Sequence, residues 1–324
     1  MQEERPKAIF YGNGLNQVAG GLNWNDLIKG LNDKDTTEGI IQCRFSEFTS
    51  NILRYEAMYL SDYIKPYRDD MPSQLTTEFE KKKHIVETIK EISPKSSPNI
   101  YKRLAGLPFS EYITTNYDHS FENALLEDGY KVVKEESGSK ETTYSIYRKV
   151  TLRNASNVVK RIWHIHGDID RPRSIQLGYD HYCKSLSEIC AYVSSNYIPK
   201  ETDKTDKDTK EGKIKALIDT PSSIKSWIDM FFAFDIHFIG YALSYDEIDI
   251  WWILNKRQRL IKEKKLSVLK NNIYFHECNG NKSDEKKYCL LKTFGVLNRN
   301  NPSETDYESF YCTTLDEIEK SENK

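Results

Sequence analysis

The chain has 324 residues, of which 38% are hydrophobic and 12% aromatic, and its formal net charge is −2. This length suggests one large domain or two joined pieces with a sizeable core. A charge so close to zero excludes a global attraction to nucleic acid or to anionic membranes. Residues 1–7 are polar and no apolar region as long as that of a signal peptide follows them, so we expect a cytoplasmic protein without a secretory signal. The most apolar stretch, WIDMFFAFDIHFIGYAL, contains Asp229, Asp235 and His237 and is too polar to span a membrane.

Strands and helices are expected to alternate along the chain. Short apolar runs predict strands at 8–11, 112–113, 161–165, 234–239 and 272–275, and helical periodicity follows at 24–31, 43–104, 121–125 and 245–254. This alternation predicts an α/β fold with a Rossmann-like, mostly parallel sheet. We expect a single domain over 1–324, with a helical layer inserted at about 37–108.

Four further segments lie at or outside the expected sheet. Residues 131–150 resemble a hairpin with its tip at 137–139, and residues 310–315, FYCTTL, predict an additional edge strand. The charged stretch 200–213 contains almost no apolar residues and predicts a surface loop. The basic run at 256–265 fits a solvated helix face better than a nucleic-acid site.

Polar or glycine residues follow four of the expected strands. The segments are GNGLN at 12–16, TTNYD at 114–118, HIHGD at 164–168 and GYALSYD at 240–246. In an open α/β sheet, ligands bind at the carboxyl ends of the strands, near the switch point in strand order. We therefore expect the four segments to converge on one crevice. The alternative is that they only cap helices, in which case they would not meet.

The glycines of GNGLN allow two interpretations. Gln17 occupies the place of the third glycine in GxGxxG, so the fingerprint is incomplete. Glycines after a strand allow close approach of a pyrophosphate, but an ordinary glycine turn has the same composition.

The two histidines of HIHGD also allow more than one interpretation. A metal would need a third ligand, and no Cys or His lies at a suitable spacing, so we expect no metal. His164 or His166 could be a buried, hydrogen-bonded residue, and His166 is the better general base because it lies nearer the crevice. In TTNYD, Asp118 or Thr115 would cap the next helix, which leaves Asn116 unexplained.

Taken in order, the four segments resemble the sirtuin (silent information regulator two) family, and most closely its bacterial NADase branch of antiphage defence. The sirtuin pattern runs glycine-alanine-glycine, threonine-glutamine-asparagine-x-aspartate, histidine-glycine and a glycine after a later strand. The resemblance covers residues 8 to 254, and Asp180 and Tyr182 fit a YDHY-like stretch of the bacterial branch.

Three departures from the family pattern argue against protein deacylation. The six cysteines form no CxxC pair, so we expect no zinc ribbon. The arginine of the deacylase cofactor loop is missing after the first glycines, and Trp24 occupies the position where the family has an aromatic residue. Thr115 replaces the family's glutamine.

The resemblance implies NAD⁺ as the substrate and assigns roles to particular residues. Asn116 would hold a water or a ribose hydroxyl beside the anomeric carbon, Asp118 would hold the carboxamide, and His166 would be the base. The residues expected to bind the dinucleotide are Gly12, Asn13, Gly14, Asn16, Trp24, Thr115, Gly240, Tyr241 and Asp246.

The implied activity is hydrolysis of NAD⁺ to nicotinamide and ADP-ribose, which would deplete NAD⁺ in abortive infection. The resemblance implies activation by a protein subunit encoded nearby or by self-assembly, and no membrane is involved. Two other functions stay open: a non-catalytic nucleotide-binding sensor, and a sirtuin-type deacylase or ADP-ribosyl transferase.

Overall fold

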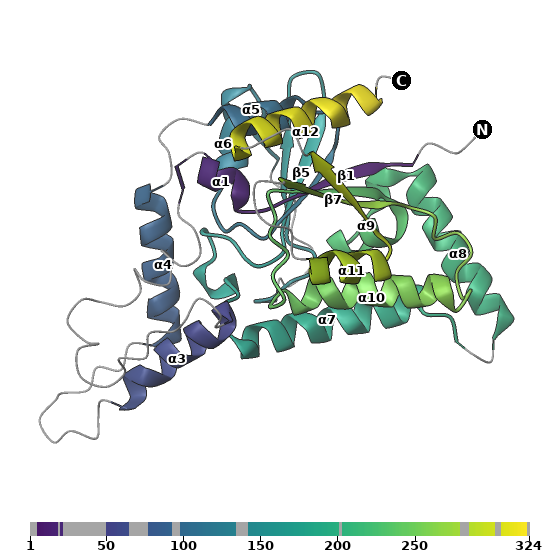
Figure 1. The fold of residues 1–324 in the computed structure, drawn as a ribbon, viewed down its shortest axis with the longest axis horizontal. Coiled ribbons are helices and arrows are strands. Elements are labelled where there is room, and N and C mark those ends of the chain that lie inside the picture. Colours follow the sequence, from purple (N-terminus) through teal and green to yellow (C-terminus); the bar gives the residue numbers. More distant parts are fainter. Residues whose placement is uncertain are drawn as a thin grey trace, which may run out of the picture.

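Strands and helices alternate along the part of the chain that the structure, a computed structural model, describes: residues 5–18, 20–21, 50–64, 77–92, 98–133, 142–200, 203–278, 285–301 and 306–322 (Figure 1). The strands are β1 Lys7–Tyr11, β2 Glu111–Thr114, β3 Lys131–Val132, β4 Val150–Arg153, β5 Val159–His164, β6 Asp235–Ile239, β7 Ile273–Cys278 and β8 Val296–Asn301. The α-helices are α1 Gly14–Val18, α3 Asn51–Ile64, α4 Glu78–Ile92, α5 Asn99–Gly106, α6 Ser120–Glu127, α7 Tyr179–Tyr197, α8 Lys204–Asp219, α9 Trp227–Ala233, α10 Ile248–Lys262, α11 Glu285–Thr293 and α12 Tyr307–Glu322. Two 3-10 turns are η2 Pro172–Ser174 and η3 Pro221–Ser223.

The strands form one eight-stranded sheet in the order β3-β4-β5-β2-β1-β6-β7-β8. The strands from β5 to β8 pair in parallel, whereas β3 with β4 and β4 with β5 pair antiparallel. The six parallel strands follow the Rossmann order 3-2-1-4-5-6, with the switch point between β1 and β6. The α/β, Rossmann-like prediction is confirmed.

Helices cover both faces of the sheet, and alternate residues of each strand enter different cores. Phe10 of β1 packs in the core beneath α7, α9 and α10, whereas Ile9 and Tyr11 pack in the core beneath α5, α6 and α12. Figure 1 shows α5, α6 and α12 on one side of the sheet and α7 and α10 on the other. Because β1 is buried on both faces, four of its five residues are buried and it reads as a continuous apolar run.

The helices α3, α4 and α5 lie between β1 and β2 in the chain, within the segment predicted to be a helical insertion. A small apolar cluster joins α3 and α4 to the segment after β5, through Tyr55, Ile85, Val86, Tyr117, Ile169, Ile175 and Leu177. Residues 22–49, which include Trp24 and the start of the predicted insertion, lie outside the described residues.

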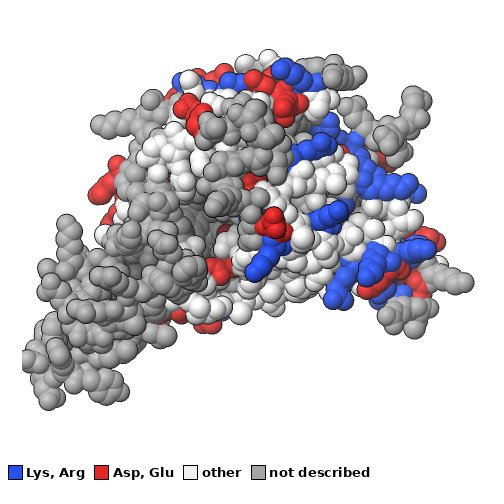
Figure 2. All heavy atoms as spheres, in the orientation of Figure 1, with Lys and Arg blue, Asp and Glu red and all other residues white. Residues whose placement is uncertain are grey.

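The prediction of a loop at 200–213 is wrong, because α8 begins at Lys204. The Asp203 side chain accepts a hydrogen bond from the Thr205 amide at 3.0 Å, which caps the helix. The charged residues then form i,i+4 ion pairs along one side, such as Lys210 with Asp206 at 3.6 Å. Apolar residues that anchor the helix, among them Ile214 at 0% exposure, come only after the charged stretch. Basic and acidic side chains are interspersed around α8 in Figure 2.

The edge strand predicted at 310–315 is also wrong, since these residues belong to α12. Phe310, Thr314 and Ile318 are buried and recur every four residues, which is a helical period that a six-residue window cannot show. The edge is formed instead by β8, paired with β7. The predicted hairpin pairs as β3 with β4, and its tip lies outside the described residues. No described helix has the length and apolar character needed to cross a membrane.

Candidate functional site

A cavity of about 450 Å³ lies at the carboxyl ends of β1, β2, β5, β6 and β7. All four polar segments contribute to its wall, so the expected convergence is observed and the helix-cap alternative does not account for them. Of the residues predicted from the sequence, those that line it are Asn13, Gly14, Asn16, Thr115, Asn116, Asp118, His166, Gly240, Tyr241 and Asp246. Gly12 is not among the lining residues, and Trp24 lies outside the described residues.

The glycines after β1 and β6 allow these two strand ends to pack closely. A Cβ atom at Gly12 or at Gly14 would lie 2.7 Å from the Gly240 carbonyl oxygen. The Gly12 amide donates to Ile239 O at 3.1 Å and the Gly14 amide donates to Gly240 O at 2.7 Å. Both amides are therefore engaged within the protein, and the ordinary-turn interpretation describes them better than a pyrophosphate cradle does.

A hydrogen-bond network holds Asp118 at the cavity wall. Asn16 Nδ2 donates to Asp118 Oδ2 at 2.6 Å, and the Tyr101 hydroxyl donates to Asn16 Oδ1 at 2.5 Å. The other carboxylate oxygen of Asp118 accepts from the Ser120 amide at 2.9 Å, at the start of α6. The predicted cap by Asp118 or Thr115 is wrong, since His119 is the N-cap residue of α6; Asp118 instead accepts from the Ser120 amide and faces the cavity, where its carboxylate can accept further hydrogen bonds.

Asn116 is the polar residue of this segment whose side chain is least satisfied. Its backbone is fixed: the amide donates to Thr114 Oγ1 at 3.0 Å, and the carbonyl oxygen lies 3.0 Å from His164 Nδ1. The residue is only 6% exposed, and its Nδ2 has no hydrogen-bond partner within the described part of the chain. Since a buried amide without a partner is costly, this atom is poised to donate to a ligand in the cavity.

His166 is held by two acidic residues of the segment that opens α10. Its Nε2 lies 2.9 Å from Asp249 Oδ2, and its Nδ1 lies 3.8 Å from Glu247 Oε2. Burial alone would lower the pKa of His166, but Asp249 and Glu247 outweigh it and raise the pKa. Burial raises the pKa of Glu247 to about 7. The Tyr182 ring packs edge-on against His166 at 5.2 Å.

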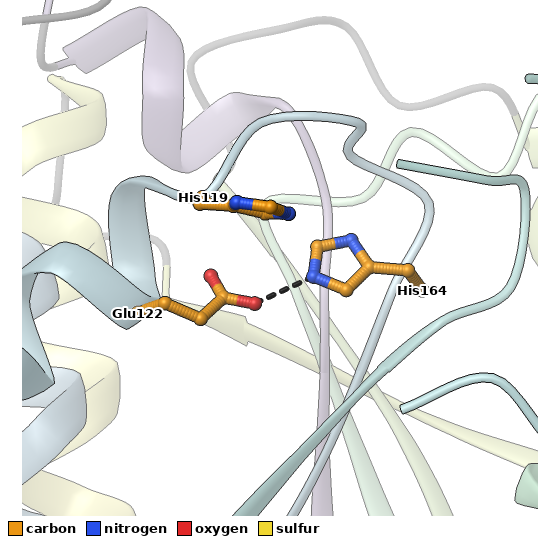
Figure 3. Close-up of side chains that lie close together, drawn as sticks. All are labelled: His119, Glu122 and His164. Atoms are coloured by element: carbon orange, nitrogen blue, oxygen red, sulfur yellow. Dashed lines mark hydrogen bonds and ion pairs between the residues drawn. The ribbon is translucent and has the colours of Figure 1, made fainter. Parts of the chain in front are cut away.

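His164 and His166 have separate partners, although both belong to HIHGD. His164 Nε2 lies 2.5 Å from Glu122 Oε1 (Figure 3). His164 is fully buried, and neither of the two residues lines the cavity. Burial lowers the pKa of His164, yet the Glu122 carboxylate outweighs this and raises it to about 9. The expectation of one buried, hydrogen-bonded histidine therefore applies to His164.

The residues of the wall or its support that sequence reasoning missed include Glu247 and Asp249 beside His166, and Asn51 and Ile52 from α3. Acidic residues are common in the first turn of a helix, so Glu247 and Asp249 carried no distinctive signal. The Asn51 amide donates to Asp246 Oδ2 at 2.8 Å, a contact across 195 positions that no local pattern predicts. Asp246 therefore caps α3 as well as lining the cavity.

The sheet order and the cavity at its switch point define a Rossmann-type α/β protein. Residues 110–252 match the family model of the SIR2-like domain. The matched region begins just before β2 and includes TTNYD, HIHGD and GYALSYD.

Two curated relatives extend this similarity. The chain is 24% identical over 192 residues to the NAD(+) hydrolase ThsA of Bacillus cereus (strain MSX-D12), covering 59% of this chain and 34% of that protein. It is 27% identical over 258 residues to the NAD(+) hydrolase ThsA of Enterococcus faecium, covering 79% of this chain and 42% of the relative. The chain thus spans less than half the length of each relative.

Proposed function

We propose that this protein is a NAD⁺ glycohydrolase that releases nicotinamide and ADP-ribose. The observation that carries the proposal is the buried, unpartnered Asn116 amide in the same cavity wall as His166, a histidine oriented by Asp249. The SIR2-like domain and the two NAD(+) hydrolase relatives support NAD⁺ as the substrate.

The residues suit a reaction in which positive charge develops on a ribose. The bond from the nicotinamide nitrogen to the anomeric carbon breaks, and its electron pair leaves with nicotinamide. Water forms the new bond to the anomeric carbon and gives up a proton. Asn116 would hold this water or a ribose hydroxyl, and Asp118 would accept hydrogen bonds from the carboxamide.

His166 would accept the proton through Nδ1. Asp249 lies against Nε2, so Nε2–H donates to this carboxylate and Nδ1 is the nitrogen left to act as base. Asn13, Asn16, Thr115, Gly240, Tyr241 and Asp246 would contact the rest of the dinucleotide, and Gly12 and Gly14 would shape the turn beside it.

The test is nicotinamide release from NAD⁺ by the purified full chain, in buffer and in a lysate of phage-infected cells. Asn116→Ala and His166→Ala should each lower turnover by about 100-fold or more. Asn123→Ala and His84→Ala, at exposed positions of α6 and α4, are the matched controls and should keep full activity.

Product and binding measurements separate the alternatives. Turnover that survives in both cavity variants would refute the assigned roles. NAD⁺ binding without turnover in any condition would favour a nucleotide sensor. A deacylase or ADP-ribosyl transferase would leave ADP-ribose on an acyl group or on a protein rather than free.

The resemblance of the four segments to the bacterial sirtuin-like branch supports a role in antiphage defence, with activation by a partner or by self-assembly. Cells expressing the intact protein should lose NAD⁺ after phage infection, and cells expressing His166→Ala should not. Equal NAD⁺ levels in the two strains would contradict the defence role while leaving the enzymatic assay to judge the activity.

A further inference from the structure

A second cluster of chemically active side chains lies behind the cavity wall, where β5 meets the start of α6. His119, Glu122 and His164 each place one potential ligand atom within 4.8 Å of the others. Figure 3 shows the His119 ring above the space between the Glu122 carboxylate and the His164 ring. None of the three lines the cavity proposed for NAD⁺. The cluster is therefore separate from the proposed active site.

Each histidine of the cluster has a partner on its Nδ1 side. The carbonyl of Asn116 can only accept a hydrogen bond, so His164 Nδ1, at 3.0 Å, carries the proton. His119 Nδ1 lies 3.7 Å from a carboxylate oxygen of Asp170. Histidines that bind metals usually donate their second ring nitrogen to a carbonyl or a carboxylate. This arrangement leaves the Nε2 atom of both rings for a common ligand.

Two polar atoms of the cluster have no partner in the described part of the chain. The ion pair of His164 with Glu122 occupies only one carboxylate oxygen. Glu122 is 4% exposed, and its Oε2 has no hydrogen-bond partner in the described part of the chain. His119 Nε2 is also buried and lacks a described partner. A ligand shared by these two buried, unpartnered atoms would satisfy both, and a carboxylate oxygen beside imidazole nitrogens favours a cation.

We propose that His119, Glu122 and His164 bind a divalent transition-metal ion of the zinc type. Two imidazole nitrogens and one carboxylate form a common three-ligand set for Zn²⁺, with a fourth position left for water. In a tetrahedral site with bonds of 2.0–2.2 Å, neighbouring ligand atoms lie about 3.3 Å apart. The contact of 2.5 Å between His164 and Glu122 would therefore open by less than about 1 Å as the ion replaces the proton between them.

The position of the site gives the ion a structural role. His164 contacts the Asn116 carbonyl, so an ion on the other side of the His164 ring would fix the segment that carries Asn116 and Asp118. The ion would also join the end of β5 to the first turn of α6. Binding should stabilise the folded chain, since the unfolded chain holds no preformed site.

The experiment uses the full chain without a polyhistidine tag, freed of metals by a chelator. Zn²⁺ is titrated by calorimetry and by thermal unfolding, and Co²⁺ binding is followed by its visible absorption, which reports a four-coordinate site. His119→Gln removes one ligand at a partly exposed residue, so this variant should fold. His84→Gln is the matched control, because His84 and Glu87 form an exposed pair three residues apart, like His119 and Glu122.

The intact chain and His84→Gln should each bind one equivalent of Zn²⁺ and melt at a higher temperature with it. His119→Gln should lose more affinity than the roughly 10- to 100-fold that removal of an outer-shell partner costs. No binding by the intact chain, or equal binding by His119→Gln, would overturn the proposal. His166→Gln tests a second location, the cluster with Glu247 and Asp249. Glu122→Gln, which should lose Zn²⁺ binding, separates the proposed site from a third location, the cluster of His119 with Asp168 and Asp170. Zn²⁺ binding that is lost in His166→Gln but kept in His119→Gln would also overturn it.

Discussion

The protonation of His166 depends on Glu247, and this dependence gives a test of the proposed base. The negative charge of Glu247 raises the pKa of His166, and burial raises the pKa of Glu247 to about 7. A base must be neutral to accept a proton. In Glu247→Gln the raising charge is gone and the pKa of His166 falls. The acidic limb of the pH profile of NAD⁺ hydrolysis should therefore move to lower pH.

The control for this prediction is Glu263→Gln, at the exposed end of α10, which should leave the limb in place. A limb that stays unchanged in Glu247→Gln, or that moves to higher pH, would contradict the assignment of His166 as the base. The profile is measured as kcat/KM, which reports ionisations of the free enzyme.

Two glycines of the chain should respond to alanine in opposite directions. A methyl group at Gly14 would lie 2.5 Å from the Tyr311 hydroxyl and 2.7 Å from the Gly240 carbonyl oxygen, so Gly14→Ala should destabilise the fold by about 1–3 kcal/mol. Gly212, inside α8, has open space around it, and Gly212→Ala should stabilise the fold by about 0.5–1 kcal/mol because alanine favours helices. Urea unfolding measures both effects. If Gly14→Ala leaves the free energy of unfolding unchanged, the ends of β1 and β6 can separate without a loss of stability.

At the scale of elements, α8 shows why a charged segment can be a helix. Its start depends on the contact of Asp203 with the Thr205 amide. Asp203→Ala should therefore lower the free energy of unfolding. Asp208→Ala, at an exposed position of the same helix, removes the same charge without removing a cap and should have a smaller effect. Equal losses in urea unfolding would mean that charge, and not capping, explains the result.

The strands and helices could be predicted where their buried apolar residues form a recognisable pattern within a short stretch of sequence. The buried strands β1 and β6 read as apolar runs that end in glycine, and both were predicted. The α8 and α12 helices were not predicted. The charged part of α8 precedes its buried residues. The buried positions of α12 repeat over a longer stretch than the six residues 310–315.

At the scale of the whole molecule, the convergence of four strand ends followed from the sequence because parallel strands place their carboxyl ends at one edge. Contacts between residues that lie far apart in the sequence could not be predicted in this way. Glu247 and Asp249 reach His166 only because α10 starts beside the end of β5, and the His119 cluster depends on the fit of α6 against β5. Such contacts are set by packing, and no spacing along the chain encodes them.

The segment between β1 and β2 also completes the cavity, and this can be tested with two neighbouring residues of α3. Ile52 is 3% exposed and lines the cavity, whereas the next residue, Leu53, is 45% exposed and does not. If the cavity binds the dinucleotide, Ile52→Ala should weaken ADP-ribose binding by roughly tenfold, because an apolar contact of this size is worth about 1–3 kcal/mol. Leu53→Ala shortens a side chain on the same helix and should leave the affinity unchanged. Calorimetry at a temperature where both variants are folded makes the comparison, since Ile52→Ala also loses core packing. Equal affinities in the two variants would place the ligand against the sheet edge alone and remove α3 from the binding site.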